Sequence, residues 1–263
     1  HDGMHFFGMS DAGAFQANRS DRGLICVNHE YVVGPFALHP AGRTVVNNVR
    51  TVAAEVDKEI NAHGVSVAEI RRGASGTAMS MVRGSTYNRR ITSATPMAFS
   101  GPARGNSLVQ TKFSPAGTDT RGTNNNCGNG YTPWGTYLTC EENFTNVIAR
   151  AAGDNALRSA KEIVGLNRYG MTQGRRSPYM WETAGADDLY VRWSASVTGA
   201  NAGVDYRNIF NTFGWIVEID PFAPTSTPLK HSALGRFAHE GCWPCKAVAG
   251  KPVVFYMGDD SRN

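Results

Sequence analysis

Short apolar runs that each end in polar side chains recur along this chain of 263 residues. Their length, and the alternation of apolar and polar residues in some of them, are typical of β-strands. The runs are residues 23–27, 65–70, 134–139, 213–220 and 253–257. Glycines and prolines, 29 and 12 in number, are spread along the chain, which favours many turns between short strands. The sequence therefore predicts a mainly β protein.

One segment has the periodicity of a helix instead. Between residues 45 and 62, apolar side chains recur every three or four positions, with charged residues mostly on the other face. His63 and Gly64 follow as a stop signal, so we expect a helix over this segment. A second, short helix is expected within residues 150–165. Residues 114–130 contain almost no apolar residue and are predicted to form a long loop.

Composition and missing motifs argue against several classes of function. The net charge is only +4, from 26 basic and 22 acidic residues, and the basic residues occur in short pairs, which argues against a nucleic-acid partner. No apolar stretch approaches the roughly 18 residues that a membrane-spanning helix requires. The sequence has no serine nucleophile elbow, no phosphate-binding P-loop, no dinucleotide-binding glycine motif and no H-E-x-x-H motif. We therefore expect a soluble protein, and the absence of these motifs argues against a serine hydrolase and a nucleotide-binding enzyme.

The polar groups at the strand ends carry the candidate chemistry. They are residues 28–30, 140–143, 236–240 and 259–260. Neighbouring carboxylates such as Glu141 and Glu142 repel each other unless solvent or a cation separates their charges. If the strand ends converge on one rim, as in propellers and barrels, their oxygens suit a hard cation such as Ca²⁺, and a cysteine adds a ligand for a transition metal. The alternative for each pair taken alone is a solvated turn.

The five cysteines are too few for a disulfide-dense scaffold, and their odd number leaves at least one thiol free, metal-bound or paired with another chain. Cys26 lies inside an apolar run and is expected in the core. Cys127 lies in a run of Gly and Asn, where a disulfide and a free thiol are both open. Cys242 and Cys245 have the C-x-x-C spacing of redox and zinc sites. Without a second such pair, a local disulfide or an ordinary loop is favoured.

An ordered series of longer motifs extends over nearly the whole chain. The longest is T-P-W-G-T-Y-L-T-C-E-E-N at residues 132–143. The others are residues 2–7, 27–31, 88–92, 95–97, 100–103, 214–221, 235–240 and 256–260. In sequence and in order, these motifs resemble those of the PhoX family of alkaline phosphatases.

This resemblance implies a β-propeller whose central funnel holds a mixed centre of iron (Fe³⁺) and calcium (Ca²⁺). It also implies hydrolysis of phosphomonoesters, with release of inorganic phosphate, in the periplasm or outside the cell. The implied thiolate ligand of iron is Cys140. The implied carboxylate ligands are Glu30, Glu141, Glu240 and Asp259, with Glu142, Asn28 and Asp260 as further candidates.

Two arginines, Arg236 and Arg89, are the candidates for holding the substrate phosphate, because a guanidinium matches the geometry of phosphate oxygens. Arg89, next to Arg90, is equally compatible with a solvated strand edge. Ala238 departs from the family pattern, since a basic residue is expected at that position.

The chains of this family are expected to continue well past residue 260. Residues 1–263 are therefore predicted to be a single propeller segment, truncated at both ends, that supplies roughly half of a closed propeller with one inserted helix. Its expected partners are the missing C-terminal half or another chain, besides small phosphomonoesters and phosphate. Two other functions stay open. One is a non-catalytic, calcium-stabilised propeller segment with a structural or interaction role, and the other is a thiol oxidoreductase that uses Cys242 and Cys245.

Overall fold

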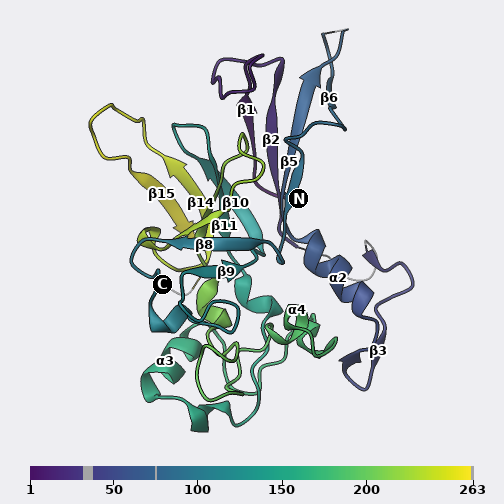
Figure 1. Ribbon diagram of the computed structural model, residues 1–263, viewed down its shortest axis with the longest axis vertical. Coiled ribbons are helices and arrows are strands. Elements are labelled where there is room, and N and C mark those ends of the chain that lie inside the picture. The colour runs from purple at the N-terminus through teal and green to yellow at the C-terminus, as the bar shows by residue number, and fades with distance from the viewer. Residues whose placement is uncertain (32–37, 75, 262–263) are drawn as a thin grey trace.

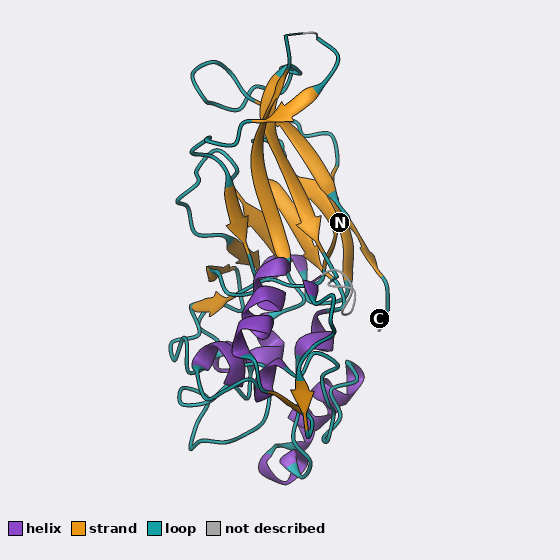
Figure 2. Ribbon diagram, turned by 90° about the vertical axis from the view of Figure 1, so that its right-hand side faces the viewer, coloured by secondary structure: helices purple, strands orange, loops and turns teal. Residues whose placement is uncertain are grey.

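Two large β-sheets and a region of helices and loops make up the part of the chain that the computed structural model describes, residues 1–31, 38–74 and 76–261. In Figure 1 most of the strands fill the upper part of the view, and helices α3 (Ala160–Arg168) and α4 (Asp188–Val191) lie below them. Figure 2 shows the same division from the side, with the helical segments gathered at one end of the sheets. The prediction of a mainly β protein is confirmed.

The first sheet joins the N-terminal strands to the strands that flank residue 80. Its members, all antiparallel, are β1 (Met4–Gly8), β2 (Arg22–His29), β5 (Gly64–Arg72), β6 (Met79–Met81) and β7 (Arg89–Ile91). The runs predicted as strands at residues 23–27 and 65–70 lie within β2 and β5. Their alternate residues, among them Leu24, Cys26 and Val67, are buried, which confirms Cys26 as a core residue.

The second sheet has eight strands in the order β15-β14-β10-β11-β12-β13-β8-β9. In chain order they are β8 (Pro96–Ser100), β9 (Asp119–Arg121), β10 (Asn126–Tyr131), β11 (Tyr137–Glu141), β12 (Ile216–Ile219), β13 (Leu229–His231), β14 (His239–Pro244) and β15 (Phe255–Asp259). β10 pairs with β14, and β13 with β8, in parallel; the other neighbours are antiparallel. Within the described residues neither sheet closes on itself.

The prediction of a loop over residues 114–130 is wrong, because β9 and most of β10 lie in this segment. β10 has the sequence NCGNGY, and its glycines allow a close approach to β14. A Cβ atom on Gly130 would lie 1.6 Å from the carbonyl oxygen of Cys242, and one on Gly128 would lie 2.0 Å from that of Glu240. Glycine at both positions therefore permits the pairing that brings Cys127 beside β14.

The helix predicted over residues 45–62 forms only in its second half, as α2 (Ala53–Ala62). The preceding residues form a two-stranded ribbon of β3 (Val45–Val46) and β4 (Val49–Arg50). Asn47 and Asn48 connect these strands with positive φ angles of 50° and 63°, which asparagine tolerates better than most residues, so the turn interrupts the helical pattern.

The short helix expected within residues 150–165 is α3, and it begins later than predicted. Ser159 caps its first turn, since the Ser159 side chain accepts from the Glu162 N–H while the Glu162 carboxylate accepts from the Ser159 N–H. The remaining helical segments are short 3₁₀ turns: η1 (Ser107–Val109), η2 (Phe144–Val147), η3 (Asp154–Leu157), η4 (Trp181–Thr183), η5 (Ile209–Thr212) and η6 (Ser232–Leu234). Among the described residues, no helix is both long and apolar enough to cross a membrane.

The two largest apolar cores among the described residues hold these layers together. The first lies between the sheets and contains Leu24 and Val65 from one sheet and Tyr137 from the other. The second lies in the helical region, where the rings of Trp181 and Trp193 have centroids 4.9 Å apart. All residues of β11, a central strand of the second sheet, are buried.

Candidate metal centre

Five side chains that offer oxygen or sulfur ligands gather where β10 meets the N-terminal segment. The Sγ atom of Cys127 and carboxylate oxygens of Asp2 and Glu30 lie within 4.8 Å of one another. The same cysteine forms a second group of this kind with the carboxylates of Glu142 and Glu240. Cys127 is common to both groups. We call these five residues the Cys127 cluster.

Strand pairing brings the members of the Cys127 cluster together. β10 pairs with β11 on one side and with β14 on the other, so Cys127 lies beside the end of β11 and the start of β14. The Glu142 N–H donates to the Asn125 carbonyl at 3.0 Å. The N-terminal segment runs beside β10, since the Gly3 N–H donates to the Cys127 carbonyl at 3.0 Å. Residues more than 200 positions apart in the sequence therefore meet at one place.

Asn28, in β2, connects that strand to the backbone of Cys127. Its side-chain amide donates to the Cys127 carbonyl at 2.7 Å and to the Gly128 carbonyl at 2.9 Å. Its Oδ1 atom accepts from the hydroxyls of Tyr137 and Thr139, at 2.9 and 2.8 Å. The buried amide of Asn28 is thus engaged on both sides and positions the backbone of Cys127, rather than facing the carboxylates.

Negative charge is concentrated in the Cys127 cluster. Burial raises the pKa of Glu142 to about 6, and the carboxylates of Glu30 and Glu240 act in the same direction. The pKa of Glu30 is raised by burial and by Asp2. Burial and hydrogen bonds to the carboxylates of Glu142 and Asp2 raise the pKa of the Cys127 thiol as well. A cation removes this repulsion and favours the ionised ligands, so the donor set fits a metal centre that takes both sulfur and oxygen.

Cys140, the residue expected to bind iron, lies outside the Cys127 cluster. Its side chain is fully buried in a small apolar group with Leu138, Ile216 and Cys242. Burial raises the pKa of this thiol well above its ordinary value. In the part of the chain that the structure describes, no group of three or more potential ligands contains Cys140. The structure therefore places Cys127, and not Cys140, beside the carboxylates.

The carboxylates of Glu141 and Glu142 have different surroundings. Glu141 is fully buried, and its carboxylate accepts from Lys230 Nζ at 2.7 Å and from the Gly214 N–H at 2.9 Å. Glu142 faces the Cys127 cluster and accepts from the side-chain amide of Asn143 at 2.7 Å. Consecutive residues of a strand point to opposite faces, so only one carboxylate of the pair reaches the cluster.

Asp259 and Asp260 lie next to the Cys127 cluster, at the end of β15. The Oδ1 atom of Asp259 accepts from the Ala238 N–H at 3.2 Å, across the pairing of β14 with β15. The charge of Asp260 contributes to the raised pKa of Glu142. Among the residues that the structure describes, neither aspartate belongs to a group of ligand atoms within 4.8 Å. Asp260 therefore acts on Glu142 through its charge and not as a member of the cluster.

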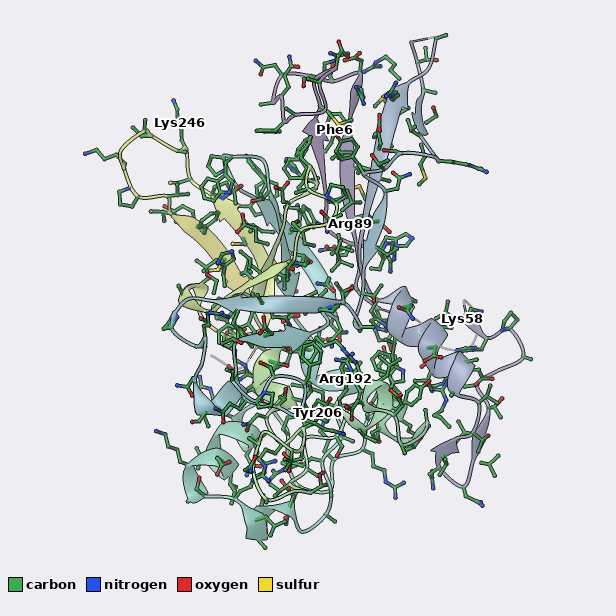
Figure 3. All side chains as sticks on the ribbon, viewed as in Figure 1. Phe6, Lys58, Arg89, Arg192, Tyr206 and Lys246 are labelled. Atoms are coloured by element: carbon green, nitrogen blue, oxygen red, sulfur yellow. The ribbon has the colours of Figure 1, made fainter. Side chains whose placement is uncertain are left out.

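The two arginines expected to hold phosphate contact backbone carbonyls elsewhere. Arg89, labelled in Figure 3 among the strands, donates to the carbonyls of Pro224 at 2.8 Å and Asp220 at 3.0 Å. It thereby holds the turn that follows β12. Arg236 donates to the Phe210 carbonyl at 2.7 Å, and its guanidinium lies 4.2 Å from the centroid of the Phe210 ring. Burial among aromatic rings lowers the pKa of Arg236 to about 10.

Sequence reasoning assigned neither Cys127 nor Asp2 to the site. Cys127 falls in a segment so rich in Gly and Asn that it indicates a loop. The glycines at alternate positions, Gly128 and Gly130, are the sequence signal that this segment is a strand. Residues two apart in a strand point the same way, and both glycines approach the backbone of β14 closely. Asp2 joins the site only through the pairing of the N-terminal segment with Asn28 and Cys127.

All five cysteines are free thiols, so the structure contains no disulfide between Cys242 and Cys245. Burial raises the pKa of Cys242 to about 12. A thiol used for exchange chemistry has a lowered pKa and is accessible, so the surroundings of Cys242 disfavour this chemistry.

Comparisons with known proteins agree with the resemblance of the motifs. The family model described as alkaline phosphatase PhoX matches residues 1–263. Among solved structures, the chain is similar to Pseudomonas fluorescens PhoX in complex with vanadate, a transition state analogue, with 36% sequence identity and a TM-score of 0.77. This match covers 99% of our chain and 39% of the other, so our chain spans well under half the length of that relative. None of the curated proteins compared with the chain matches it.

Proposed function

Because the chain belongs to the PhoX family of alkaline phosphatases, we propose that the protein hydrolyses phosphomonoesters and releases inorganic phosphate at a metal centre built on the Cys127 cluster. The observation that carries this proposal is the meeting of one cysteine and four carboxylates from separate segments of the chain. The related structure from Pseudomonas fluorescens holds vanadate as a transition state analogue, which supports phosphoryl chemistry as the reaction.

We assign the metals by the softness of the ligands. Thiolate sulfur favours a transition metal, so iron is the proposed partner of Cys127. Carboxylate oxygens suit calcium, which takes six to eight oxygen ligands and tolerates irregular geometry. Glu30, Glu142, Glu240 and Asp2 are therefore the proposed oxygen ligands, with Asp260 near enough to add to the negative field. When bound, such metals supply the positive charge that neutralises phosphate oxygens during phosphoryl transfer.

The remaining residues of the site hold these ligands in position. Asn28 fixes the backbone of Cys127 through its amide hydrogen bonds. Asn143 donates to Glu142 and so orients that carboxylate. Burial of Asn28 and of Glu142 limits the water that reaches these contacts. Outer contacts of this kind commonly change metal affinity by roughly 10- to 100-fold when they are removed.

The wider setting also follows from the family. We propose that the two open sheets belong to a β-propeller, completed by further chain of the kind that the longer relative contains. A propeller closure protects the exposed edge strands, of which β15 is one. We further propose that the protein acts in the periplasm or outside the cell, where phosphomonoesters are a source of phosphate for uptake.

The test compares two cysteine variants of the complete protein, Cys127→Ala and Cys140→Ala. We expect Cys127→Ala to lose its iron and to hydrolyse an aryl phosphate at least 100-fold more slowly, because a transition metal loses its soft ligand. Cys140→Ala is the matched control, since it removes the same atom from an apolar surrounding and should keep both metal and activity. Elemental analysis, visible absorption and release of the aryl alcohol measure these outcomes.

Retention of iron and activity by Cys127→Ala, with loss of both in Cys140→Ala, would restore Cys140 as the ligand and contradict the proposed centre. A wild-type protein that binds calcium alone and releases no phosphate would favour the alternative of a non-catalytic, calcium-stabilised segment. Metal content and turnover measured on the same preparation separate these two results.

A further inference from the structure

A cavity of about 620 Å³ lies between α3, labelled in Figure 1, and the 3₁₀ turns η1 and η5. Lys161, Gly165 and Leu166 of α3 line one side, and Leu108 and Phe210 of the two turns line the other. None of the five residues of the Cys127 cluster lines it. Pockets that enclose a whole small-molecule ligand are roughly 300–1,000 Å³, so this cavity has the size of a ligand site.

We propose that this cavity binds a small organic anion that carries an aromatic ring. The ring packs against Tyr169 and Phe210, and the anionic group contacts Lys161. This inference goes beyond the proposed function, because it requires neither the metals nor the phosphatase reaction.

Two aromatic rings form a fixed apolar wall of the cavity. Tyr169 and Phe210 meet edge to face, with ring centroids 5.5 Å apart. The Tyr169 hydroxyl donates to the Arg236 carbonyl at 2.9 Å, and the Arg236 guanidinium lies 4.8 Å from the centroid of the Tyr169 ring. Rings held in this way can accept a further ring edge to face or offset, and a wall that is already ordered lowers the entropic cost of binding.

The charged side chains around the cavity are mostly cationic. Among the described residues that line it, the acidic one is Glu162, and the cationic ones are Arg158, Lys161, Arg168, Arg207 and Arg236. Arg158 is paired with Asp154, and Arg207 is paired with Asp205 at 2.8 Å. These two arginines therefore already have carboxylate partners, and we do not assign the anion to them.

Lys161 is the cation that an anionic ligand can use. Its side chain is exposed, and it makes no hydrogen bond or ion pair with any residue that the structure describes. On the opposite wall, Ser107 adds a hydroxyl group that can donate to the same anion. An anionic group at Lys161 therefore gains a charge partner without breaking an existing ion pair.

Gly165 is an independent sign that the cavity is kept open. It lies inside α3, where glycine costs roughly 0.5–1 kcal/mol relative to alanine. Nothing lies within 4 Å of the place that its Cβ would occupy, so close packing does not require a glycine here. Because Gly165 lines the cavity, a longer side chain at this position would extend into the space that we assign to the ligand.

The test uses two fluorescent probes that differ only in charge, anilinonaphthalene sulfonate and its uncharged parent, phenylnaphthylamine. Both are titrated into the complete protein, and the fluorescence gives their affinities. We expect the sulfonate to bind the wild type saturably at one site. Gly165→Leu should weaken the binding of both probes about tenfold or more, because its side chain takes the place of the ring.

Lys161→Gln separates the charge from the apolar wall. We expect it to weaken the binding of the sulfonate about two- to fivefold, as for an exposed ion pair, and to leave the affinity of the uncharged probe unchanged. Lys246→Gln is the matched control, since Lys246 is also exposed and does not line the cavity; Figure 3 labels it on the loop between β14 and β15. Its affinities should equal those of the wild type.

Thermal unfolding of each variant shows whether it is folded, and Lys161→Gln decides the question if Gly165→Leu is not. Wild-type affinity for both probes in a folded Gly165→Leu protein would overturn the inference. So would equal losses of the sulfonate in Lys161→Gln and Lys246→Gln, because they would show a general charge effect. Binding of the sulfonate to the wild type without saturation would mean that the probe adheres to the surface at large, and it would also contradict the proposed site.

Discussion

Glu141 and Lys230 form an ion pair that protein atoms enclose completely. Burial lowers the pKa of Lys230, and the carboxylate of Glu141 opposes this effect. The Lys230 ammonium also donates to the Thr212 carbonyl at 2.8 Å and lies 4.2 Å from the centroid of the Phe213 ring. An enclosed charge with this many partners has a structural role, because removal of one partner leaves the other charge buried and unpaired. At the residue scale, these contacts distinguish Glu141 from the adjacent Glu142, which belongs to the Cys127 cluster.

Glu182 is a partly buried carboxylate of a different kind. In the described part of the chain, its Oε2 atom is buried and has no hydrogen-bond partner. Burial raises the pKa of Glu182 from 4.5 to about 7. The cleft that it lines also contains Lys112 and Asp205, but Lys112 pairs with Asp188 at 2.7 Å and Asp205 with a neighbouring arginine. Neither group therefore compensates the charge of Glu182.

This arrangement predicts a pH-dependent stability. An acid whose pKa is higher in the folded state binds more protons in that state than in the unfolded state. The free energy of unfolding therefore falls as the pH rises from about 4.5 to about 7, and it stays constant above about pH 7. Glu182→Gln removes this effect. We expect the variant to match the wild type at pH 4.5 and to be more stable at pH 8, by roughly 1–3 kcal/mol. Denaturant unfolding at the two pH values measures the difference, and an equal gain at both would contradict the assignment.

At the scale of elements, β10 is the strand on which the site depends. It separates β14 from β11 and carries Cys127 between them. Gly130 faces the backbone of β14, where an added Cβ would lie 1.6 Å from the Cys242 carbonyl oxygen. Backbone cannot move aside as the end of a flexible side chain does, so any side chain at this position forces the two strands apart.

We therefore expect Gly130→Ala to destabilise the protein by several kcal/mol, on the order of the largest effects of single substitutions, and to release metal. Gly165→Ala is the matched control. Gly165 lies inside α3 with open space around its Cα, so an alanine there should stabilise the protein by roughly 0.5–1 kcal/mol. Chemical unfolding and elemental analysis of both variants test the pair. Equal stability of the two variants would show that the close approach of β10 and β14 is not maintained in solution.

These elements also show how far the sequence predicts the fold. β2 and β5 follow the periodicity of their own residues, such as Leu24 and Val67, because burial on one face of a strand produces that pattern. The first half of the predicted helix fails because Asn47 and Asn48 form a turn that overrides an apolar spacing of helical type. β10 is missed because its glycines reflect its packing against β14. That strand lies more than 100 residues away along the chain.

The candidate site was predictable in its chemistry and only partly in its members. Carboxylates at strand ends do meet a cysteine, and Glu30, Glu142 and Glu240 are among those expected. Which of two adjacent residues faces the site, and which cysteine joins them, depends on strand register. Cys127 joins the site because β10 lies beside β14, and a local pattern of residues contains no information about that pairing.

At the scale of the whole molecule, the Cys127 cluster connects the two sheets. Asp2 and Glu30 belong to the segments next to β1 and β2 of the first sheet, whereas Cys127, Glu142 and Glu240 belong to the second. A metal bound by both groups acts as a cross-link between the sheets and offsets the repulsion of their carboxylates. Without metal, that repulsion acts directly against the packing of one sheet on the other.

Metal removal should therefore lower the Tm of the complete protein by several degrees, and by more when the free metal concentration before removal is further above its Kd. The variant Glu30→Gln with Glu240→Gln distinguishes a cross-link from a general ionic effect. Neutral amides bind metal more weakly and repel each other less, so we expect a lower Tm in the loaded state and a higher Tm in the stripped state than in the wild type. Asp11→Asn, which changes an exposed carboxylate outside the cluster, should leave both values unchanged. Calorimetric scans with and without a chelator measure the Tm of all three proteins. A wild-type Tm that does not respond to metal removal would mean that the packing of the sheets is independent of the Cys127 cluster, and that the charge in this site is held in place by the fold alone.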